Sequence, residues 1–295
     1  MFQIKHFDIQ KILITLIFTV LGVVLPDTFL TFLAAIIVLT IGIIHGANDL
    51  HIVSKIRRTT TKQHFGYLFV IYVLFVFVMV FALYRFPLLS LLLFVVISSF
   101  HFGEQQWYQK TISKSATVHF FYAAFGFMLF ALLFFTHKSQ TANIILEITQ
   151  EQSPGYLFDR FLMFASGIFT MFLIINYKQI KPQLFIQAIG FLFLILLFSQ
   201  TSLLWSFSVY FVLWHSLPSL KEQAIVLHPH GPSPIRSYVK SAIPYWLLSL
   251  IGLTAAILFV DNEIISLTSL FFAFLAAITI PHVIAIFLMH KKFIS

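Results

Sequence analysis

Long, uninterrupted runs of apolar residues dominate this chain. They begin near Ile12, Phe29, Phe65, Pro87, Val118, Leu157, Leu184, Leu203, Ile243 and Ile264. Most of them have the length that a helix needs to cross a bilayer. Backbone polar groups find no water inside a membrane, so spanning runs of this kind are helical. The sequence therefore predicts an all-α, polytopic integral membrane helix bundle with about ten transmembrane helices.

The composition agrees with a chain that is solvated by lipid. Only 9% of the residues are charged and 60% are hydrophobic, whereas about 25% of a soluble protein is charged. No linker or repeat divides the chain, so we expect a single integral membrane domain over residues 1–295, with longer loops only at 136–156 and 221–240. The absence of cysteine excludes disulfides, thiolate zinc sites and iron–sulfur clusters.

The net charge of +8 is explained by topology. The sequence has no basic stripe with interleaved aromatic residues, so we expect no nucleic-acid partner. If ten helices leave both termini in the cytoplasm, all of the 18 basic residues except Arg85, Lys138 and Arg160 fall on the cytoplasmic side, as the positive-inside rule requires. This predicts a multi-pass protein of the cell's inner (cytoplasmic) membrane. The first apolar run lacks a small-residue cleavage site and is expected to be a membrane helix.

Four histidines are predicted to lie at a similar depth in the membrane. His45 in GIIHGANDL, His101 in SSFHFGEQQW and His215 in LWHSLPSL each lie near the end of an apolar run that points toward the cytoplasm, and His282 has the same direction and a similar depth. A polar side chain in the hydrocarbon marks a functional site. Neutral imidazole is a common ligand of first-row transition metals. The sequence therefore predicts one metal ion shared by these histidines.

Polar residues at helical spacing follow the first three histidines: Asp49, Glu104 and Ser219. Each can share a helix face with its histidine and can accept the second ring N–H of a metal ligand. The two carboxylates are alternatively direct ligands, as in a two-histidine, one-carboxylate iron site.

Proline and glycine near the histidines suggest how the rings come together. Pro281 frees a carbonyl group and bends its helix, which is expected to turn His282 inward. Gly46 and Gly103 are expected to allow close approach of neighbouring helices.

The stretches HGANDL, SFHFGEQQW, WHSLPSL and PHVIAIFLMH together resemble the bacteriorhodopsin-related-protein-like family of bacterial and archaeal β-carotene 15,15′-dioxygenases. The resemblance covers nearly the whole chain. It implies a membrane-embedded enzyme that depends on Fe(2+) and cleaves the central double bond of β-carotene with O2 into two retinals. It further implies that His45, His101 and His215 are iron ligands, and it suggests a functional link to a microbial rhodopsin that uses retinal.

The third motif departs from the family pattern. Some members carry H-x-x-x-H there, and in this chain the second position is Ser219. The fourth ligand therefore stays open between His282 and water.

Other functions are compatible with histidines in a membrane. The alternative from another class is a histidine-based metal-ion or proton transporter, which predicts broken helices and an inverted repeat. A di-iron oxidase would need clustered histidine motifs that this chain lacks, and a structural partner of a rhodopsin would use the fold without chemistry. Spacing and composition alone lead to a metal site, whereas β-carotene and retinal rest on the resemblance.

Overall fold

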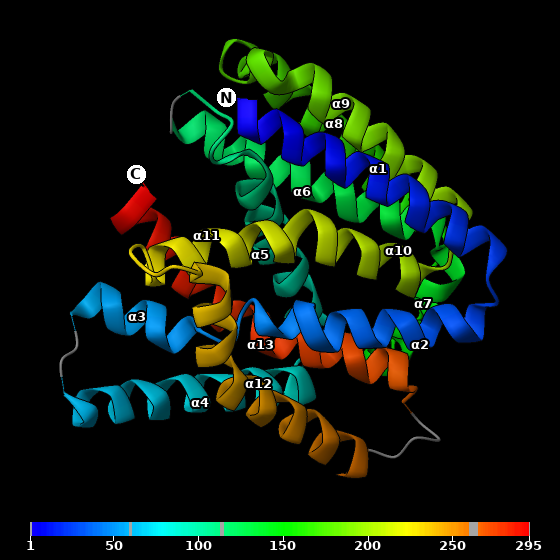
Figure 1. Ribbon diagram of the computed structural model, residues 1–295. Coiled ribbons are helices and arrows are strands. Elements are labelled where there is room, and N and C mark those ends of the chain that lie inside the picture. The colour runs from blue at the N-terminus through cyan, green and yellow to red at the C-terminus, as the bar shows by residue number, and fades with distance from the viewer. Residues whose placement is uncertain (1, 59–60, 113–114, 260–264, 295) are drawn as a thin grey trace. The chain divides into compact units, whose positions relative to one another are not determined.

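The protein is built from helices. The computed structural model describes residues 2–58, 61–112, 115–259 and 265–294, and helix is the only regular secondary structure in that part of the chain (Figure 1). The prediction of an all-α membrane bundle is confirmed.

Eight helices within the described residues are long and apolar enough to cross a membrane. They are α4 (Lys62–Arg85), α5 (Pro87–Trp107), α6 (Ala116–Thr136), α8 (Tyr156–Ile175), α9 (Tyr177–Gln200), Leu203–Leu227, α12 (Pro234–Phe259) and Leu267–Phe293. The two earlier expected spans correspond to α1 (Phe2–Val24) and to the shorter apolar helix Asp27–Gly42. The total of ten and the cytoplasmic location of the termini stay predictions.

Three helices contain a π-helical segment, in which each backbone hydrogen bond spans one residue more than in an α-helix. The first lies at the end of Asp27–Gly42, where α2 (Asp27–Ile37) continues into η1 (Val38–Gly42). The second lies within Leu203–Leu227, which consists of α10 (Leu203–Tyr210), η2 (Phe211–Ser216) and α11 (Leu217–Leu227). The third follows α13 (Leu267–Met289) as η3 (His290–Ile294).

Local chemistry explains several helix starts. The Thr61 hydroxyl accepts a hydrogen bond from the His64 backbone N–H at 3.3 Å, and Ser266 caps α13 in the same way, 3.2 Å from the Ser269 N–H. Both caps satisfy a backbone donor that the first helical turn leaves unpaired. Pro87 begins α5, where its missing N–H has no cost.

The two connections that were expected to be long loops are largely helical. Residues 138–149 form the helix α7 (Lys138–Thr149), and α11 continues to Leu227 while α12 already begins at Pro234. The expectation was wrong because it followed only apolar runs of membrane length. A twelve-residue helix that mixes polar and apolar residues produces no such run.

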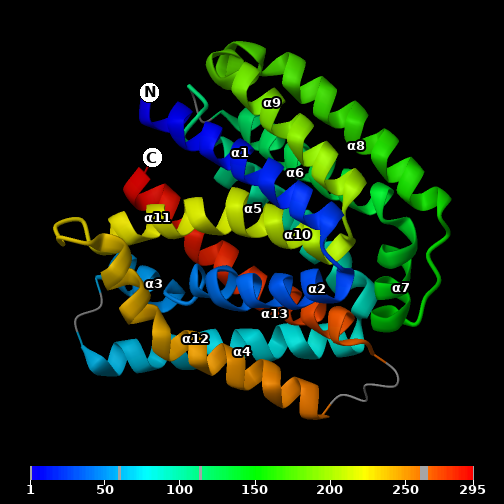
Figure 2. The same ribbon diagram turned by 45° about the vertical axis from the view of Figure 1, so that its right-hand side comes forward.

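The chain divides into two compact units. Unit 1 comprises Met1–Val38, Ser98–Asn143 and Gln152–Ser216. Within it, α6 packs against α8 and α9, and α1 packs against α9, as Figures 1 and 2 both show. Its interior is rich in aromatic side chains, such as Trp107, which lies edge-on to Phe121 and Phe125.

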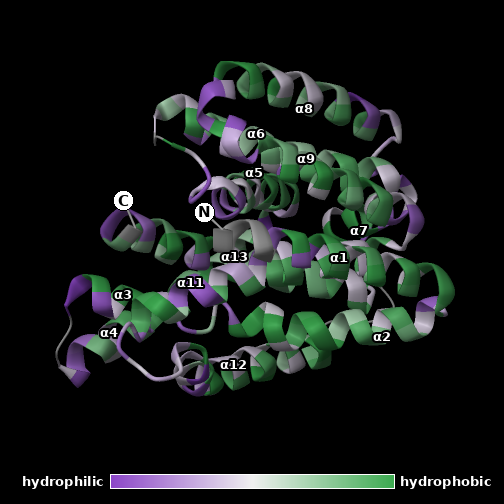
Figure 3. Cartoon of the chain, turned by 45° about the horizontal axis from the view of Figure 1, so that its top comes forward, coloured by the Kyte–Doolittle hydropathy of each residue, from purple (hydrophilic) through white to green (hydrophobic). Residues whose placement is uncertain are grey.

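Unit 2 comprises Leu39–Ile97, Ile144–Glu151 and Leu217–Ser295. Within it, α13 packs against α4, α12 and α3 (Asp49–Arg57), and α11 packs against α12. Much of the outward surface of α4 and α12 is apolar, as the green ribbon of Figure 3 illustrates for α12. Such surfaces fit contact with lipid chains.

Candidate metal centre

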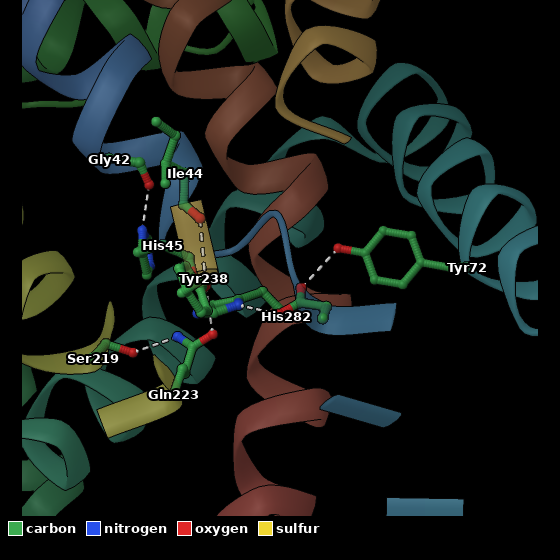
Figure 4. A network of polar contacts seen from close by, with 9 residues as sticks. Gly42, Ile44, His45, Tyr72, Ser219, Gln223, Tyr238 and His282 are labelled. Carbon is green, nitrogen blue, oxygen red and sulfur yellow. Dashed lines mark hydrogen bonds and ion pairs between the residues drawn. The ribbon is translucent and has the colours of Figure 1, made fainter. Parts of the chain in front are cut away.

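In unit 2, His45 lies where the chain leaves the helix. Residues 45–48 form a turn between η1 and α3, with the Gly46 N–H donating to the Ile43 carbonyl at 3.1 Å. The His45 ring is buried, and its Nδ1 contacts the Gly42 carbonyl oxygen (Figure 4). A carbonyl oxygen only accepts, so Nδ1 carries the proton and donates it. In the neutral ring the lone pair is then on Nε2, the nitrogen that can bind a metal.

His282 is fixed in the same tautomer by a carboxylate. Its Nδ1 lies 2.8 Å from Asp49 Oδ1, and the Tyr72 hydroxyl donates to Asp49 Oδ2, also at 2.8 Å. An ionised carboxylate is an acceptor only, so the His282 Nδ1–H donates and Nε2 keeps its lone pair. A carboxylate behind a histidine is the usual support of a metal-binding imidazole.

The pairing of Asp49 differs from the one expected from spacing. Asp49 follows His45 by four residues, but its carboxylate bonds to His282 on α13. The turn at residues 45–48 is the physical reason, because it breaks the helical relation between the two positions. Pro281 lies within α13, and His282 next to it is buried.

The two rings of unit 2 are neighbours. The His45 and His282 centroids are 4.8 Å apart and the planes are nearly perpendicular. Gly46 lies against the His282 ring, where an added Cβ would be 3.3 Å from Nδ1. Gly46 therefore makes room for the His282 ring, and the close helix approach expected there stays a prediction.

A second polar network holds the turn that carries His45 (Figure 4). The Tyr238 hydroxyl lies 2.6 Å from the His45 carbonyl oxygen and 2.8 Å from Gln223 Oε1, while the Tyr238 carbonyl accepts from Asn48 Nδ2 at 2.8 Å. Tyr238 thus binds the turn at two points, which fixes a segment that lacks regular helical bonding.

Ser219 belongs to this network. Its hydroxyl accepts from Gln223 Nε2 at 2.9 Å. His215, four residues earlier, lies in η2, where the wider π-helical turn alters the spacing that would place the two residues on one face.

In unit 1, His101 and His215 form the corresponding pair. Each is 1% exposed, and their ring centroids are 4.7 Å apart at 75°. His101 comes from α5 and His215 from η2. Aromatic rings surround His215, with Phe102 at 4.6 Å and Phe211 at 5.4 Å between centroids.

Glu104 is buried on the same helix as His101. The helix α5 is continuous through both residues, so their spacing of three keeps them on one side of it. The expected helical relation exists here, in contrast to that of Asp49.

Gly103 brings two backbones together. A Cβ at Gly103 would overlap the Tyr122 carbonyl group, and one at Gly126 would overlap the Ser99 carbonyl group. Helices α5 and α6 therefore touch backbone to backbone on both sides of His101, and the close approach expected at Gly103 is confirmed.

Sequence reasoning did not identify Tyr72, Tyr238 or Asn48. The two tyrosines lie within apolar stretches, YVLFVF and SYVKSAIPYW, where they resemble the many aromatic residues that face lipid or the core. Only their hydrogen bonds distinguish them, and these depend on the tertiary structure.

The chemistry of the donors fits a transition metal. Within unit 2, the buried histidines His45 and His282 are neighbours and offer ring nitrogens that could bind a metal ion. At His45 and His282 the Nδ1 proton is already engaged, which leaves Nε2 as the ligand atom. Borderline nitrogen donors of this kind suit iron, zinc, copper and nickel, so the identity of the metal is not fixed by them.

Comparison with known proteins gives one match. The model of a family described as beta-carotene 15,15′-dioxygenase matches residues 36–290 of this chain. No curated protein and no solved structure matches it.

Proposed function

Since the chain belongs to the β-carotene 15,15′-dioxygenase family and is thus an enzyme of carotenoid cleavage, we propose that it splits β-carotene with O2 into two molecules of all-trans-retinal. In this reaction the central carbon–carbon double bond breaks and each oxygen atom ends in one aldehyde. The atoms and electrons balance without any further reductant. The family match over residues 36–290 is the observation that carries the proposal.

We propose ferrous iron, Fe(2+), as the cofactor, held by His45, His101, His215 and His282. The support is that these buried histidines form one pair within each unit, and that sequence topology predicts them at one depth. When bound, the ferrous ion supplies the one-electron chemistry that allows O2 to react with a closed-shell alkene.

The residues around the histidines have defined tasks in this proposal. Asp49 keeps the proton on Nδ1 of His282 and orients its ring, and Tyr72 holds the carboxylate. We propose that Glu104 likewise supports the His101 ring by accepting its second N–H and does not bind the metal directly. Phe102 and Phe211 pack on His215 and exclude water from it.

We propose His282 as the fourth ligand in place of Ser219 or water. His282 is buried and has the carboxylate partner that metal-binding histidines usually have. Ser219 instead takes part in the network of Gln223 and Tyr238.

The membrane environment suits the substrate. β-Carotene is apolar and resides in lipid, and a multi-pass helical protein can receive it without a soluble domain. We propose a single integral membrane domain in the inner membrane of the cell, with retinal passed on to a microbial rhodopsin. Membership of an enzyme family favours this function over the histidine-based transporter.

The test is expression in a bacterium engineered to make β-carotene. The colour should bleach and retinal should accumulate, and both changes should require oxygen. The His101→Ala protein should insert in the membrane and leave the colour intact. Unequal apocarotenals would contradict central cleavage, and unaltered β-carotene beside folded native protein would contradict the activity.

A further inference from the structure

A buried cluster of charges joins Asp8 and Lys11 of α1 to Lys110, which lies just beyond the end of α5. Lys11 Nζ lies 2.8 Å from Asp8 Oδ1, and Lys110 Nζ lies 3.3 Å from the same oxygen. Gln187 donates to the other Asp8 oxygen at 2.9 Å. The side chains of Asp8, Lys11 and Lys110 are at most 9% exposed.

A contribution to folding stability alone does not account for this cluster. Buried ion pairs often contribute no more stability than apolar side chains of the same volume, because the charges lose their hydration. Here two lysines share one carboxylate, and burial lowers the pKa of Lys110 to about 7. Burial thus disfavours the charged form of Lys110. The proposed reaction uses none of these groups.

The cluster of Asp8, Lys11 and Lys110 lies next to the indole ring of Trp214. Lys11 Nζ lies over the Trp214 ring, 4.7 Å from its centroid, and the Trp214 indole N–H donates to Thr15 Oγ1 at 2.9 Å. On the α9 side, Gly190 makes room for the ring, because an added Cβ would lie 2.5 Å from Trp214 Cη2. Three independent contacts thus fix one buried indole.

Trp214 directly precedes His215 in the π-helical segment η2. Because the two residues are consecutive, the backbone that carries the indole also carries the imidazole. We propose that α1 is a positioning element for His215 and that it acts through Lys11, Thr15 and Trp214. This role rests on the proposed metal site, and α1 lies outside residues 36–290 that match the family.

A matched pair of variants separates this role from a general effect on stability. Lys11→Met and Lys110→Met each remove one of two lysines, and each leaves a neutral pair with Asp8. Only Lys11→Met removes the cation above Trp214. Both proteins are purified in detergent without metal and titrated with Co²⁺, whose visible absorption reports its ligands.

We expect Lys11→Met to weaken Co²⁺ binding roughly tenfold, the lower end for a group outside the ligand shell, and to alter the absorption bands. Lys110→Met should bind like the native protein, and Lys11→Arg should restore the native spectrum. In the metal-free proteins, the tryptophan emission should change in Lys11→Met but not in Lys110→Met, with Trp214→Phe identifying the contribution of Trp214.

Glycine substitutions give a second, independent test. Gly190→Ala should displace the indole and weaken Co²⁺ binding in the same direction as Lys11→Met. Gly167→Ala on α8 of the same unit is the control, because nothing lies within 4 Å of its added Cβ. If Lys11→Met does not fold, the comparison of Gly190→Ala with Gly167→Ala decides whether α1 positions His215.

His215→Ala separates failure of the inference from failure of the proposed function. If His215→Ala binds Co²⁺ like the native protein, the metal site itself is wrong. If His215→Ala loses binding while both Lys11→Met and Gly190→Ala match the native protein, the positioning role of α1 is overturned.

Discussion

The two histidine pairs have similar ring geometry and lie in different surroundings. In unit 2, His45 and His282 are fixed by hydrogen bonds to Gly42 and Asp49 and by the Tyr238 network. In unit 1, His101 and His215 lie among aromatic rings, on helices fixed by close backbone contact at Gly103 and by the packing of Trp214.

The difference teaches where each pair is vulnerable. A hydrogen-bonded support fails when a donor or acceptor is removed, and the helices around it can stay in place. A packed support fails when volume changes, because a dense interior has no room to adjust. Polar substitutions around His45 and His282 should therefore act on metal binding, whereas volume changes at the contact of α5 with α6 should act on folding.

The largest effect is expected from loss of any one of the four histidines, and it should be the same for both pairs. Alanine at His45, His101, His215 or His282 should remove the bound iron and the retinal formed, while Ser219→Ala should cost much less. The measurement is iron per purified chain beside retinal yield. An inactive Ser219→Ala protein together with a normal His282→Ala protein would reverse the assignment of the fourth ligand.

Gly103→Ala should have the next largest effect and would act through packing. Its Cβ would overlap the Tyr122 carbonyl group, so we expect a loss of about 3 kcal/mol, the upper end for an overpacked interior. Thermal unfolding in detergent measures it. Gly66→Ala on α4 is the control, since its Cβ would meet nothing within 4 Å. If the two variants were equally stable, close packing at Gly103 would not be what supports His101 in unit 1.

Asp49→Asn tests the polar support of unit 2. The amide keeps the volume of the side chain but removes the charge that holds the His282 N–H. Iron affinity should fall about 10–100-fold while the unfolding temperature changes little. A large loss of stability with unchanged iron affinity would show that the carboxylate serves folding instead.

Tyr72→Phe should give the smallest effect. It removes only the hydroxyl that donates to Asp49 Oδ2, so we expect about a fivefold loss of iron affinity, equivalent to roughly 1 kcal/mol for one hydrogen bond. In the Asp49→Asn protein, Tyr72→Phe should lower the iron affinity by a smaller factor than it does in the native protein, because the two groups act together. Full additivity would mean that Tyr72 does not act through Asp49.

The sequence predicted the properties that depend on composition and position along the chain. The helical fold, the apolar spans and the burial of His45 and His101 follow from runs of residues that a membrane constrains strongly. The partner of Asp49 could not be predicted, because a turn at residues 45–48 replaces the helix that spacing assumes. The roles of Tyr238 and Trp214 depend on contacts between helices that are distant in sequence.

The bond between Asp49 and His282 also bears on how the protein is made. The two residues are separated by 233 positions, so at about 5–20 residues per second the ribosome needs roughly tens of seconds to deliver the second after the first. Until α13 has entered the membrane, His45 lacks its neighbouring imidazole and Asp49 lacks its histidine partner. Metal capture at the proposed site is therefore expected to be a late event, which follows insertion of α13.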